Sequence, residues 1–404
     1  MRLVLAMAGL LALLTPQVRA ADSDRLTQVK RLVAEYEAAD KKYFDKSWPQ
    51  HTVDDNIRRY EAWPGWTYLP KFVKLAEVKP DDEAAFLCCQ WILERTNNVG
   101  NADRRIFDAD QKAWEILATH PLSERQLPTL CLTAAFRHGR GREEFLQAVL
   151  DRKELSRENR GIATAALAEL IAQKYEIIES REFEPPATGF AKYLEGRFAP
   201  AWGQDLVSAN SSKFKAQSIE LFRQVLANYG DVPLNISLPN FRHIDKLRDK
   251  ATKSLHALEH LTIGSAAPGI VGKDLHGRPL DLAAYRGRVV MLSFWFTGCG
   301  PCMGMVPQEQ RLVKKYDGSR FALLSICGDE SIETANKTAV EHKMDWPCWF
   351  DGSNGPIARN WNVLGWPTIY ILNEQGVIVA KQLRGDPLDT KLAELLEKKT
   401  DKKQ

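Results

Sequence analysis

Apolar residues recur every three to four positions through the first two thirds of the chain, which is the spacing of one face of an amphipathic helix. Proline and glycine fall at the borders of these periodic segments, notably Pro121, Pro128 and the turn at 139–141. The pattern predicts helices at 26–43, 83–93, 109–117, 127–136, 144–150, 161–175, 212–229 and 241–261. We therefore expect residues 21–262 to form an all-helical domain.

Consecutive amphipathic helices of this kind are typical of helical arrays, in which each helix pair packs on the next. The spacing from one pair to the next is not constant, so the resemblance to TPR or HEAT arrays is loose. Such an array offers a binding surface. This keeps open the alternative that the protein is a binding or adaptor protein that acts through its helical domain.

After Gly264 the helical spacing gives way to short apolar runs that alternate with helices. The runs 289–296 and 321–327 are apolar at nearly every position, which is typical of strands buried on both faces. Further elements are predicted as helices at 302–316, 333–342 and 388–398, and as a hairpin of strands 368–372 and 377–383. This order predicts an α/β domain at 263–404, with a mixed central sheet and helices on both faces.

The first twenty residues have the order of a secretory signal peptide. Arg2 supplies a positive start, 3–14 form a short apolar run, and 18–20 resemble a small-residue cleavage site. The run is shorter than the roughly 20 residues that a helix needs to cross a bilayer, which favours cleavage after Ala20 over an uncleaved membrane anchor. The mature protein is then expected to be soluble and periplasmic, or otherwise extracytoplasmic.

Positive and negative charges are nearly balanced, with 55 lysines and arginines, 52 aspartates and glutamates, and a formal net charge of +3. No basic patch with interleaved aromatic residues stands out, so nucleic acid is not an expected partner. Seven cysteines in 404 residues are too few for a disulfide-stapled scaffold. Their odd number implies at least one free thiol in an exported protein.

Two of the cysteines, Cys299 and Cys302, form a C-x-x-C motif directly after a buried run and at the start of a helix. On a first helical turn this spacing brings the Cα atoms about 5 Å apart, within reach of a disulfide. The free N–H groups and the positive dipole end of the helix stabilise a thiolate at Cys299, which we expect to be exposed, with Cys302 more buried. A zinc site would need a second ligand pair, and His276 and His342 are scattered, so neither a metal nor a cofactor is expected.

The segment 294–302 (FWFTGCGPC) resembles the active-site strand and turn of the TlpA/ResA-type thioredoxin-like redoxins. The segments 264–268 (GSAAP) and 282–290 (LAAYRGRVV) are similar to the parts of that family that precede the active-site strand. Pro307 stands where the family's first helix has its proline, and 365–368 (GWPT) resembles the loop that holds its cis-proline. The resemblance covers about residues 263–398 and implies a thioredoxin fold with thiol–disulfide exchange by the two cysteines.

The resemblance also implies roles for the residues around the dithiol. Gly300 and Pro301 shape the turn, and Trp295 flanks the dithiol as an apolar wall, with plain core packing as its alternative role. Pro367 is expected to be cis and to face the dithiol, with an ordinary trans turn proline as the alternative. A cis bond there would leave the main chain of Trp366 free to pair with an extended substrate.

Two positions depart from the family pattern. Ser293 stands where thioredoxin has a buried aspartate, and Met305 stands where ResA-type proteins have a glutamate. Both carboxylates that usually move the proton of the buried thiol are thus missing, which predicts slow resolution by Cys302 near neutral pH. Asp329 or Glu330 could substitute, although capping of the next helix is the favoured role for them.

The remaining cysteines and a histidine pair admit two interpretations each. Cys327 and Cys348 fall on predicted neighbouring strands, where a second disulfide is possible but buried free thiols are favoured. His256 and His260 are spaced i, i+4 as metal ligands can be, but without a third ligand a solvated helix face is favoured. The other cysteines are expected in the helical core: Cys88, Cys89 and Cys131.

The favoured function is that of an exported thiol–disulfide oxidoreductase, in which Cys299 attacks a target disulfide and Cys302 resolves the mixed disulfide. The Gly–Pro pair between them is that of reducing thioredoxins, which favours a reductant. The resemblance implies re-reduction by a membrane electron donor of the DsbD/CcdA kind, and targets among disulfide-bearing exported proteins, apocytochrome c among the candidates. A thiol peroxidase is the alternative, since Thr297 stands close to Cys299, although the C-x-x-C motif and the expected cis-proline argue against it.

Overall fold

The computed structural model of the chain describes residues 20–47, 53–96, 104–135, 139–182, 211–234, 245–353, 355–363 and 365–397. The predicted signal peptide at 1–20 lies outside these residues except for Ala20, at which the first helix begins. None of the helices within the described ranges is long and apolar enough to span a membrane. The chain divides into two compact units, which we describe separately.

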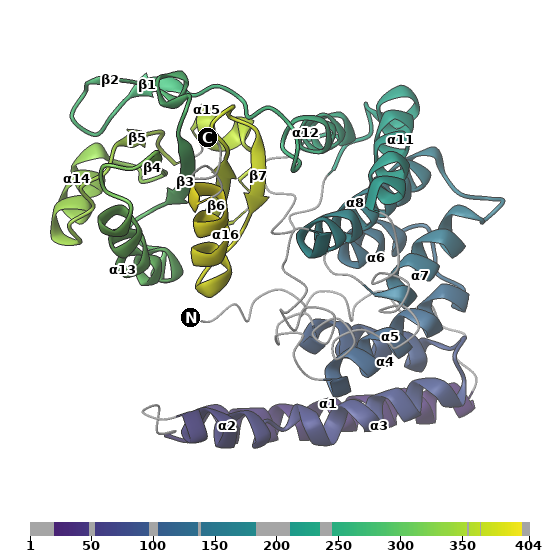
Figure 1. The fold of residues 1–404 in the computed structure, drawn as a ribbon. Helices are drawn as coiled ribbons and strands as arrows, with labels where there is room; N and C mark the ends of the chain where they lie inside the picture. The colour runs from purple at the N-terminus through teal and green to yellow at the C-terminus, as the bar shows by residue number, and fades with distance from the viewer. Residues whose placement is uncertain are drawn as a thin grey trace. The chain divides into compact units, whose positions relative to one another are not determined.

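The first unit is helical (Figure 1). Its helices are α1 (Ala20–Asp45), α2 (Val53–Glu61), α3 (Gly65–Val78), α4 (Glu83–Thr96), α5 (Arg104–Thr119), the first part of α6 (Leu127–Ala134) and α7 (Arg140–Leu150). Helices α3, α4, α5 and α7 pack on one another in chain order, as expected of an array. Tyr36, Phe72 and Trp91 join α1, α3 and α4, with the rings of Phe72 and Trp91 stacked 3.8 Å apart.

The sequence did not predict α2 and α3 as helices. Pro64, Gly65 and Pro70 are strong helix breakers, so this stretch resembles a loop in the sequence. In the structure Pro64 is the N-cap residue of α3, where its missing N–H costs no helical hydrogen bond, and Pro70 is exposed inside the helix. Trp63 and Trp66 pack edge to face at 4.9 Å, so they form a packing corner between α2 and α3.

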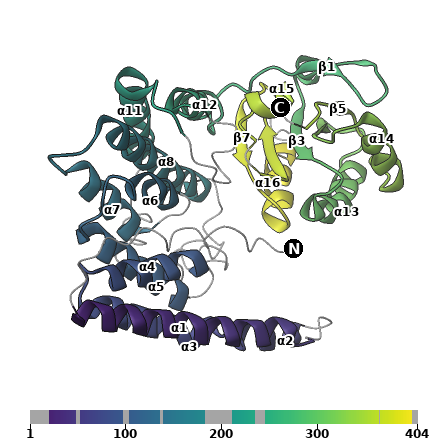
Figure 2. The same cartoon turned by 180° about the vertical axis from the view of Figure 1, so that it is seen from behind.

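The second unit joins three helices to the α/β sheet domain. Helices α8 (Arg157–Glu182), α11 (Ser211–Tyr229) and α12 (Leu247–His260) pack side by side, as both Figure 1 and Figure 2 show. Glu179 of α8 accepts the main-chain N–H of Ile263 over 2.9 Å and forms an ion pair of 3.7 Å with Lys381 of the sheet. The border predicted at residue 263 therefore lies inside this compact unit. Whether residues 21–262 and 263–404 are separate domains stays a prediction.

The sheet has five strands in the order β5-β4-β3-β6-β7. They are β3 (Val289–Trp295), β4 (Phe321–Cys327), β5 (Cys348–Phe350), β6 (Thr368–Leu372) and β7 (Ile378–Lys381). Strands β3, β4 and β5 are parallel to one another, whereas β6 runs antiparallel to β3 and to β7. The predicted mixed sheet and its β6–β7 hairpin are confirmed. A separate two-stranded sheet, β1 (Val271–Lys273) with β2 (Pro279–Asp281), precedes it.

Helices cover both faces of the sheet, which confirms the predicted layers. Residues of α13 (Gly300–Lys315), α14 (Ile332–Glu341) and α16 (Asp386–Glu397) form one core with alternate residues of β3 and β4. The other alternate residues pack with α15 (Pro356–Asn360) and the C-terminal end of α12. Figure 1 shows α13 at the end of β3 and α16 beside β6.

Candidate redox site

Strand β3 leads directly to the dithiol. All of its residues are buried up to Trp295, and α13 begins at Gly300 with Cys299 as its N-cap residue. The N–H of Cys299 donates to the carbonyl of Phe296 over 3.1 Å, and the N–H of Met303 donates to the carbonyl of Cys299 over 3.1 Å. Cys299 therefore stands at the N-terminus of a helix of 16 residues, where free N–H groups and the helix dipole favour negative charge.

Cys299 and Cys302 form a disulfide with their Cα atoms 5.2 Å apart. The N–H of Cys302 donates to Sγ of Cys299 over 3.1 Å, and after reduction the same N–H would stabilise a thiolate there. Only 5% of Cys299 and 3% of Cys302 is exposed. The expected exposure of Cys299 is thus wrong for this disulfide state, because the bond holds its sulfur in the apolar cluster that also contains Cys302 and Met305.

The two residues between the cysteines lie at the surface. Gly300 and Pro301 are both exposed, so they form the rim over the disulfide. Pro301 lies in the first turn of α13, where its missing N–H costs no helical hydrogen bond.

The peptide bond between Trp366 and Pro367 is cis, which confirms the expectation from the resemblance. Within the described residues, the main chain of Trp366 has no hydrogen-bond partner. Its ring packs edge to face on Phe296 at 5.6 Å and lies so close to Gly328 that a Cβ there would meet it at 2.5 Å. Both rings are half-buried against the core cluster that contains Cys299 and Cys302. They form an aromatic pair beside the dithiol.

Trp295 is buried beside the dithiol, a position that fits both its expected role as an apolar wall and plain core packing. Only 2% of it is exposed, and it packs in the same cluster as both cysteines. It supports the dithiol from within the core.

Asp329 holds the turn that leads into the dithiol. It accepts the N–H of Thr297 over 2.9 Å and its hydroxyl over 2.7 Å, and it also accepts the thiol of Cys327 over 3.3 Å. The cap of α14 is Ser331, whose hydroxyl oxygen accepts the N–H of Thr334 over 3.2 Å. The capping role expected for Asp329 is wrong because Ser331 directly precedes the helix. Glu330 is exposed.

Sequence analysis missed a buried acid, Glu309 of α13. Only 2% of Glu309 is exposed, and the hydroxyl of Ser293 donates to its Oε1 over 2.6 Å. Burial raises the pKa of Glu309 to about 7, and the hydrogen bond from Ser293 lowers it in part. Its position seven residues after Cys302, on the same face of the helix, was the available signal.

Cys327 and Cys348 are free thiols, as favoured. Their strands are neighbours, but the register sets Cys348 opposite Ser325 and Cys327 opposite Phe350. With strands about 4.8 Å apart and about 3.3 Å per residue, the two Cα atoms are about 8 Å apart, beyond the reach of a disulfide. Burial raises the pKa of both thiols, so they lie in the core as unreactive groups.

The cysteines of the helical region are buried, as expected, and none of them is in a disulfide: Cys88, Cys89 and Cys131. His256 is not simply solvated, because its Nε2 lies 3.0 Å from the carbonyl oxygen of Asn360 in α15. Its ring is 5.0 Å from that of His260. Among the residues the structure describes, no three His, Cys, Asp or Glu side chains are grouped as a metal site would need.

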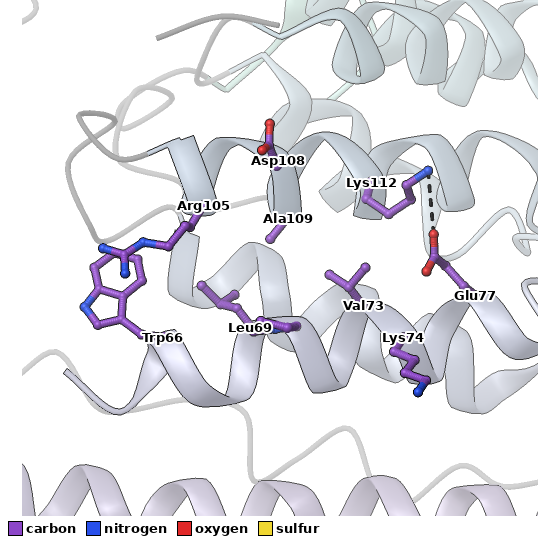
Figure 3. A pocket seen from close by; sticks show the side chains of 10 residues that line it. Trp66, Leu69, Val73, Lys74, Glu77, Arg105, Asp108, Ala109 and Lys112 are labelled. Atoms are coloured by element: carbon purple, nitrogen blue, oxygen red, sulfur yellow. Dashed lines mark ion pairs between the residues drawn. The ribbon is translucent and has the colours of Figure 1, made fainter. Parts of the chain in front are cut away.

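A groove of about 530 Å³ lies between α3 and α5 of the first unit (Figure 3). Its floor is apolar, with Leu69, Val73 and Ala109. Two contacts cross it: Lys112 lies 3.7 Å from Glu77, and the guanidinium of Arg105 lies 3.8 Å from the ring centre of Trp66. The groove carries no grouping of nucleophilic or redox residues.

Comparison with family models matches residues 263–381 to the AhpC/TSA family. Among known proteins, the chain is 31% identical over 118 residues to the thioredoxin-like protein YneN of Bacillus subtilis, which covers 28% of this chain and 68% of YneN. It is 28% identical over 142 residues to the thiol-disulfide oxidoreductase ResA of Bacillus thuringiensis, which covers 35% of this chain and 81% of that protein.

Solved structures that match include the thioredoxin domain of a thiol-disulfide oxidoreductase from Bacteroides vulgatus. It is 28% identical and covers 33% of this chain and 98% of that chain, with a TM-score of 0.32. A thiol-disulfide oxidoreductase from Bacteroides fragilis is 29% identical and covers 33% of this chain and 100% of that one, with a TM-score of 0.31. The family model does not extend into the helices before residue 263.

Proposed function

This chain belongs to the family of thioredoxin-like thiol–disulfide oxidoreductases, and on that premise we propose that Cys299 and Cys302 are its reacting pair and that it reduces disulfides of exported proteins. The observation that carries the proposal is the disulfide between them at the N-terminus of α13. There the N–H of Cys302 and the helix dipole stabilise negative charge on Sγ of Cys299.

The reaction has two exchange steps. In the reduced enzyme the thiolate of Cys299 attacks one sulfur of a target disulfide, a new S–S bond forms, the target's own S–S bond breaks, and the first target thiolate leaves. Cys302 then loses its proton and attacks Sγ of Cys299. This closes the Cys299–Cys302 disulfide and releases the second target thiolate, so two electrons pass from the dithiol to the target.

The surroundings of the dithiol support binding of an extended segment of the target. The main chain of Trp366, ahead of the cis-proline Pro367, offers an N–H and a carbonyl to a strand laid beside it. The aromatic pair of Phe296 and Trp366 offers apolar contact next to the same place. Gly300 and Pro301 at the rim leave room for the approaching disulfide.

The signal-like first twenty residues support an extracytoplasmic, soluble location, and the Gly–Pro pair in the motif supports the reducing direction. We infer a potential nearer to the about −270 mV of thioredoxin than to the about −120 mV of a strong oxidant. A membrane donor of the DsbD/CcdA kind would then restore the dithiol. The targets are exported proteins with disulfides, with apocytochrome c as the first to test.

The roles of the cysteines are tested by insulin reduction with the full chain. Cys299→Ser should abolish turnover, with at least a hundredfold loss and no adduct, because the attacking thiolate is gone. Cys302→Ser should also stop turnover but accumulate a mixed disulfide that dithiothreitol releases. Cys348→Ser, a change of the same kind in the same core, should retain the natural rate.

An adduct on the Cys299→Ser variant instead of the Cys302→Ser variant would contradict the assigned order. Peroxide consumption that survives in Cys302→Ser would favour the peroxidase alternative. The structure gives that alternative little support, because the hydroxyl of Thr297 is held by Asp329 and Thr338.

Export is tested by sequencing the N-terminus of the protein isolated from its host. A mature chain that begins at Ala21 and fractionates away from membranes is the expected result. Retention of Met1 in the membrane fraction would contradict it.

A further inference from the structure

The exchange steps require that the buried Cys302 lose a proton, and Glu309 is a buried acid that the steps so far do not use. The buried residues of α13 follow one face of the helix and include Cys302, Met305 and Glu309 at positions i, i+3 and i+7. Glu309 therefore lies on the same face as Cys302, two turns further along. Helical side chains lean toward the N-terminus of their helix, so the carboxyl of Glu309 leans toward the end that carries Cys302.

Ser293 connects this acid to the strand under the dithiol. Side chains alternate along β3, so Ser293 lies on the same face as Met291 and Trp295, which pack in one cluster with Cys302. Its hydroxyl occupies the layer between β3 and α13 and donates to Glu309 over 2.6 Å. Only 3% of Ser293 is exposed, so the hydroxyl and the carboxyl are shielded from water together.

Few charged groups act on this pair. The side chains in the same cluster from β3, β4 and α16 include Met291, Leu323, Leu388 and Leu392, which are apolar. The titratable groups of that cluster are the thiols of Cys299, Cys302, Cys327 and Cys348 and the phenol of Tyr316. Burial holds the pKa of Cys327 and that of Cys348 above their ordinary value. Burial also raises the pKa of Glu309 to about 7, so near neutral pH this acid is present in both protonation states.

We propose that Glu309, acting through the hydroxyl of Ser293, takes the proton of the Cys302 thiol when Cys302 resolves the mixed disulfide. This inference rests on the cysteine roles proposed above. The S–H bond of Cys302 breaks, one water between Cys302 and Ser293 carries the proton to the oxygen of Ser293, and the hydroxyl proton of Ser293 passes to the carboxylate of Glu309. The Cys302 thiolate then attacks Cys299, and Glu309 returns its proton to water after the target thiolate has left.

The proposal changes what the sequence predicted for this step. Ser293 and Met305 in place of carboxylates predicted slow resolution near neutral pH. With Glu309 as acceptor, resolution is already fast near pH 7, because a large share of the acid is then ionised.

The test separates attack from resolution in one experiment. The reduced full chain is mixed with 5,5′-dithiobis(2-nitrobenzoate), a coloured disulfide: the first nitrothiolate appears when Cys299 attacks, and the second when Cys302 resolves. Both phases are measured by stopped flow between pH 5 and pH 9. In Glu309→Gln we expect the second phase to be at least about tenfold slower at pH 7 and to rise steeply up to pH 9. The first phase should stay within about twofold of the natural protein.

Two further variants and a control sharpen the result. Ser293→Ala keeps the acid but removes the relay, and it should slow the second phase alone. Glu309→Asp retains a carboxyl and should restore part of the rate lost in Glu309→Gln. The control is Glu330→Gln, the same chemical change at an exposed acid near the end of β4, which should match the natural protein in both phases.

The proposal is overturned if Glu309→Gln slows both phases equally, since that is the effect of a structural role. It is also overturned if the pH profile of its second phase superimposes on that of the natural protein. Should Glu309→Gln not fold, the same two outcomes in Ser293→Ala decide. Absence of a first phase in the natural protein would instead contradict the proposed function.

Discussion

Asp82 in the helical unit and Glu309 beside the dithiol are both buried carboxylates, with 7% and 2% of the residue exposed. For each of them burial is the largest influence and raises the pKa. Asp82 nevertheless has a pKa below its ordinary value, because the side chain of Arg25 and the N–H of Ala85 donate to it over 2.6 and 2.8 Å. Glu309 has a pKa of about 7, because its partner Ser293 is uncharged.

The difference shows what distinguishes a structural acid from one that can exchange protons. A cation fixes the charge of a buried carboxylate, so Asp82 remains ionised and ties α1 to the start of α4. A neutral hydroxyl satisfies the carboxyl without fixing its charge, so Glu309 can change protonation near neutral pH. Three predictions for the free energy of unfolding follow from this difference, from the largest expected change to the smallest.

Removing the cation should give the largest effect. Arg25→Ala leaves Asp82 buried without its charged partner, which we expect to lower the free energy of unfolding by about 3 kcal/mol at pH 7, as measured by urea denaturation. The loss should shrink toward pH 4, where the stranded carboxyl becomes protonated. Arg31→Ala is the matched control, because its pair with Glu35 is exposed, and it should cost less than about 0.5 kcal/mol. Equal losses of unfolding free energy in Arg25→Ala and Arg31→Ala would contradict a special role of the buried ion pair.

Neutralising Glu309 should raise the free energy of unfolding at high pH, whereas Arg25→Ala lowers it. Its folded pKa of about 7 lies above the ordinary 4.5, so its contribution to stability is full below about pH 4.5 and is lost as the pH rises through 7. Glu309→Gln should therefore be more stable than the natural protein at pH 9, by up to about 3 kcal/mol, and similar to it at pH 5. Thermal melts across this range measure the difference, and a constant offset would contradict the raised pKa.

Removing the neutral partner should have the smallest effect. The hydrogen bond from Ser293 lowers the pKa of Glu309, so Ser293→Ala should raise that pKa above its natural value. The loss of stability would still begin near pH 4.5, where the unfolded chain ionises, but it would continue to higher pH than in the natural protein, with a difference of about 1 kcal/mol above neutral pH. A titration of the carboxyl band by infrared difference spectroscopy measures the shift, and a lower pKa in Ser293→Ala would contradict the role of the hydroxyl.

The sequence predicted the sheet domain more closely than its active-site chemistry. Strands β4 and β6 have the predicted bounds, because a continuous apolar stretch between turn residues leaves little choice of where the strand begins and ends. The cis bond before Pro367 followed from the resemblance. Helices α2 and α3 were missed because local breakers outweigh periodicity in a sequence, whereas packing decides in the fold.

The buried acid could not be recognised from the usual positions. A glutamate in an amphipathic helix is normally assigned to the solvated face, and only the packing of α13 on β3 shows that Glu309 is inside. Asp329 was misjudged for a related reason, since a carboxylate shortly before a helix resembles a cap. Its three hydrogen bonds to Thr297 and Cys327 depend on tertiary structure.

The contacts of Glu179 limit how this gene can be recombined. Through its contacts with Ile263 and Lys381, this residue of α8 attaches the group of helices α8, α11 and α12 to the sheet domain. A crossover at residue 263 would transplant the redoxin without the acid that binds its first residues, and would leave Lys381 facing the recipient's surface. A chimera joined near residue 156 instead carries α8, α11 and α12 along with the sheet. The unit inherited together is therefore longer than the stretch that resembles other redoxins.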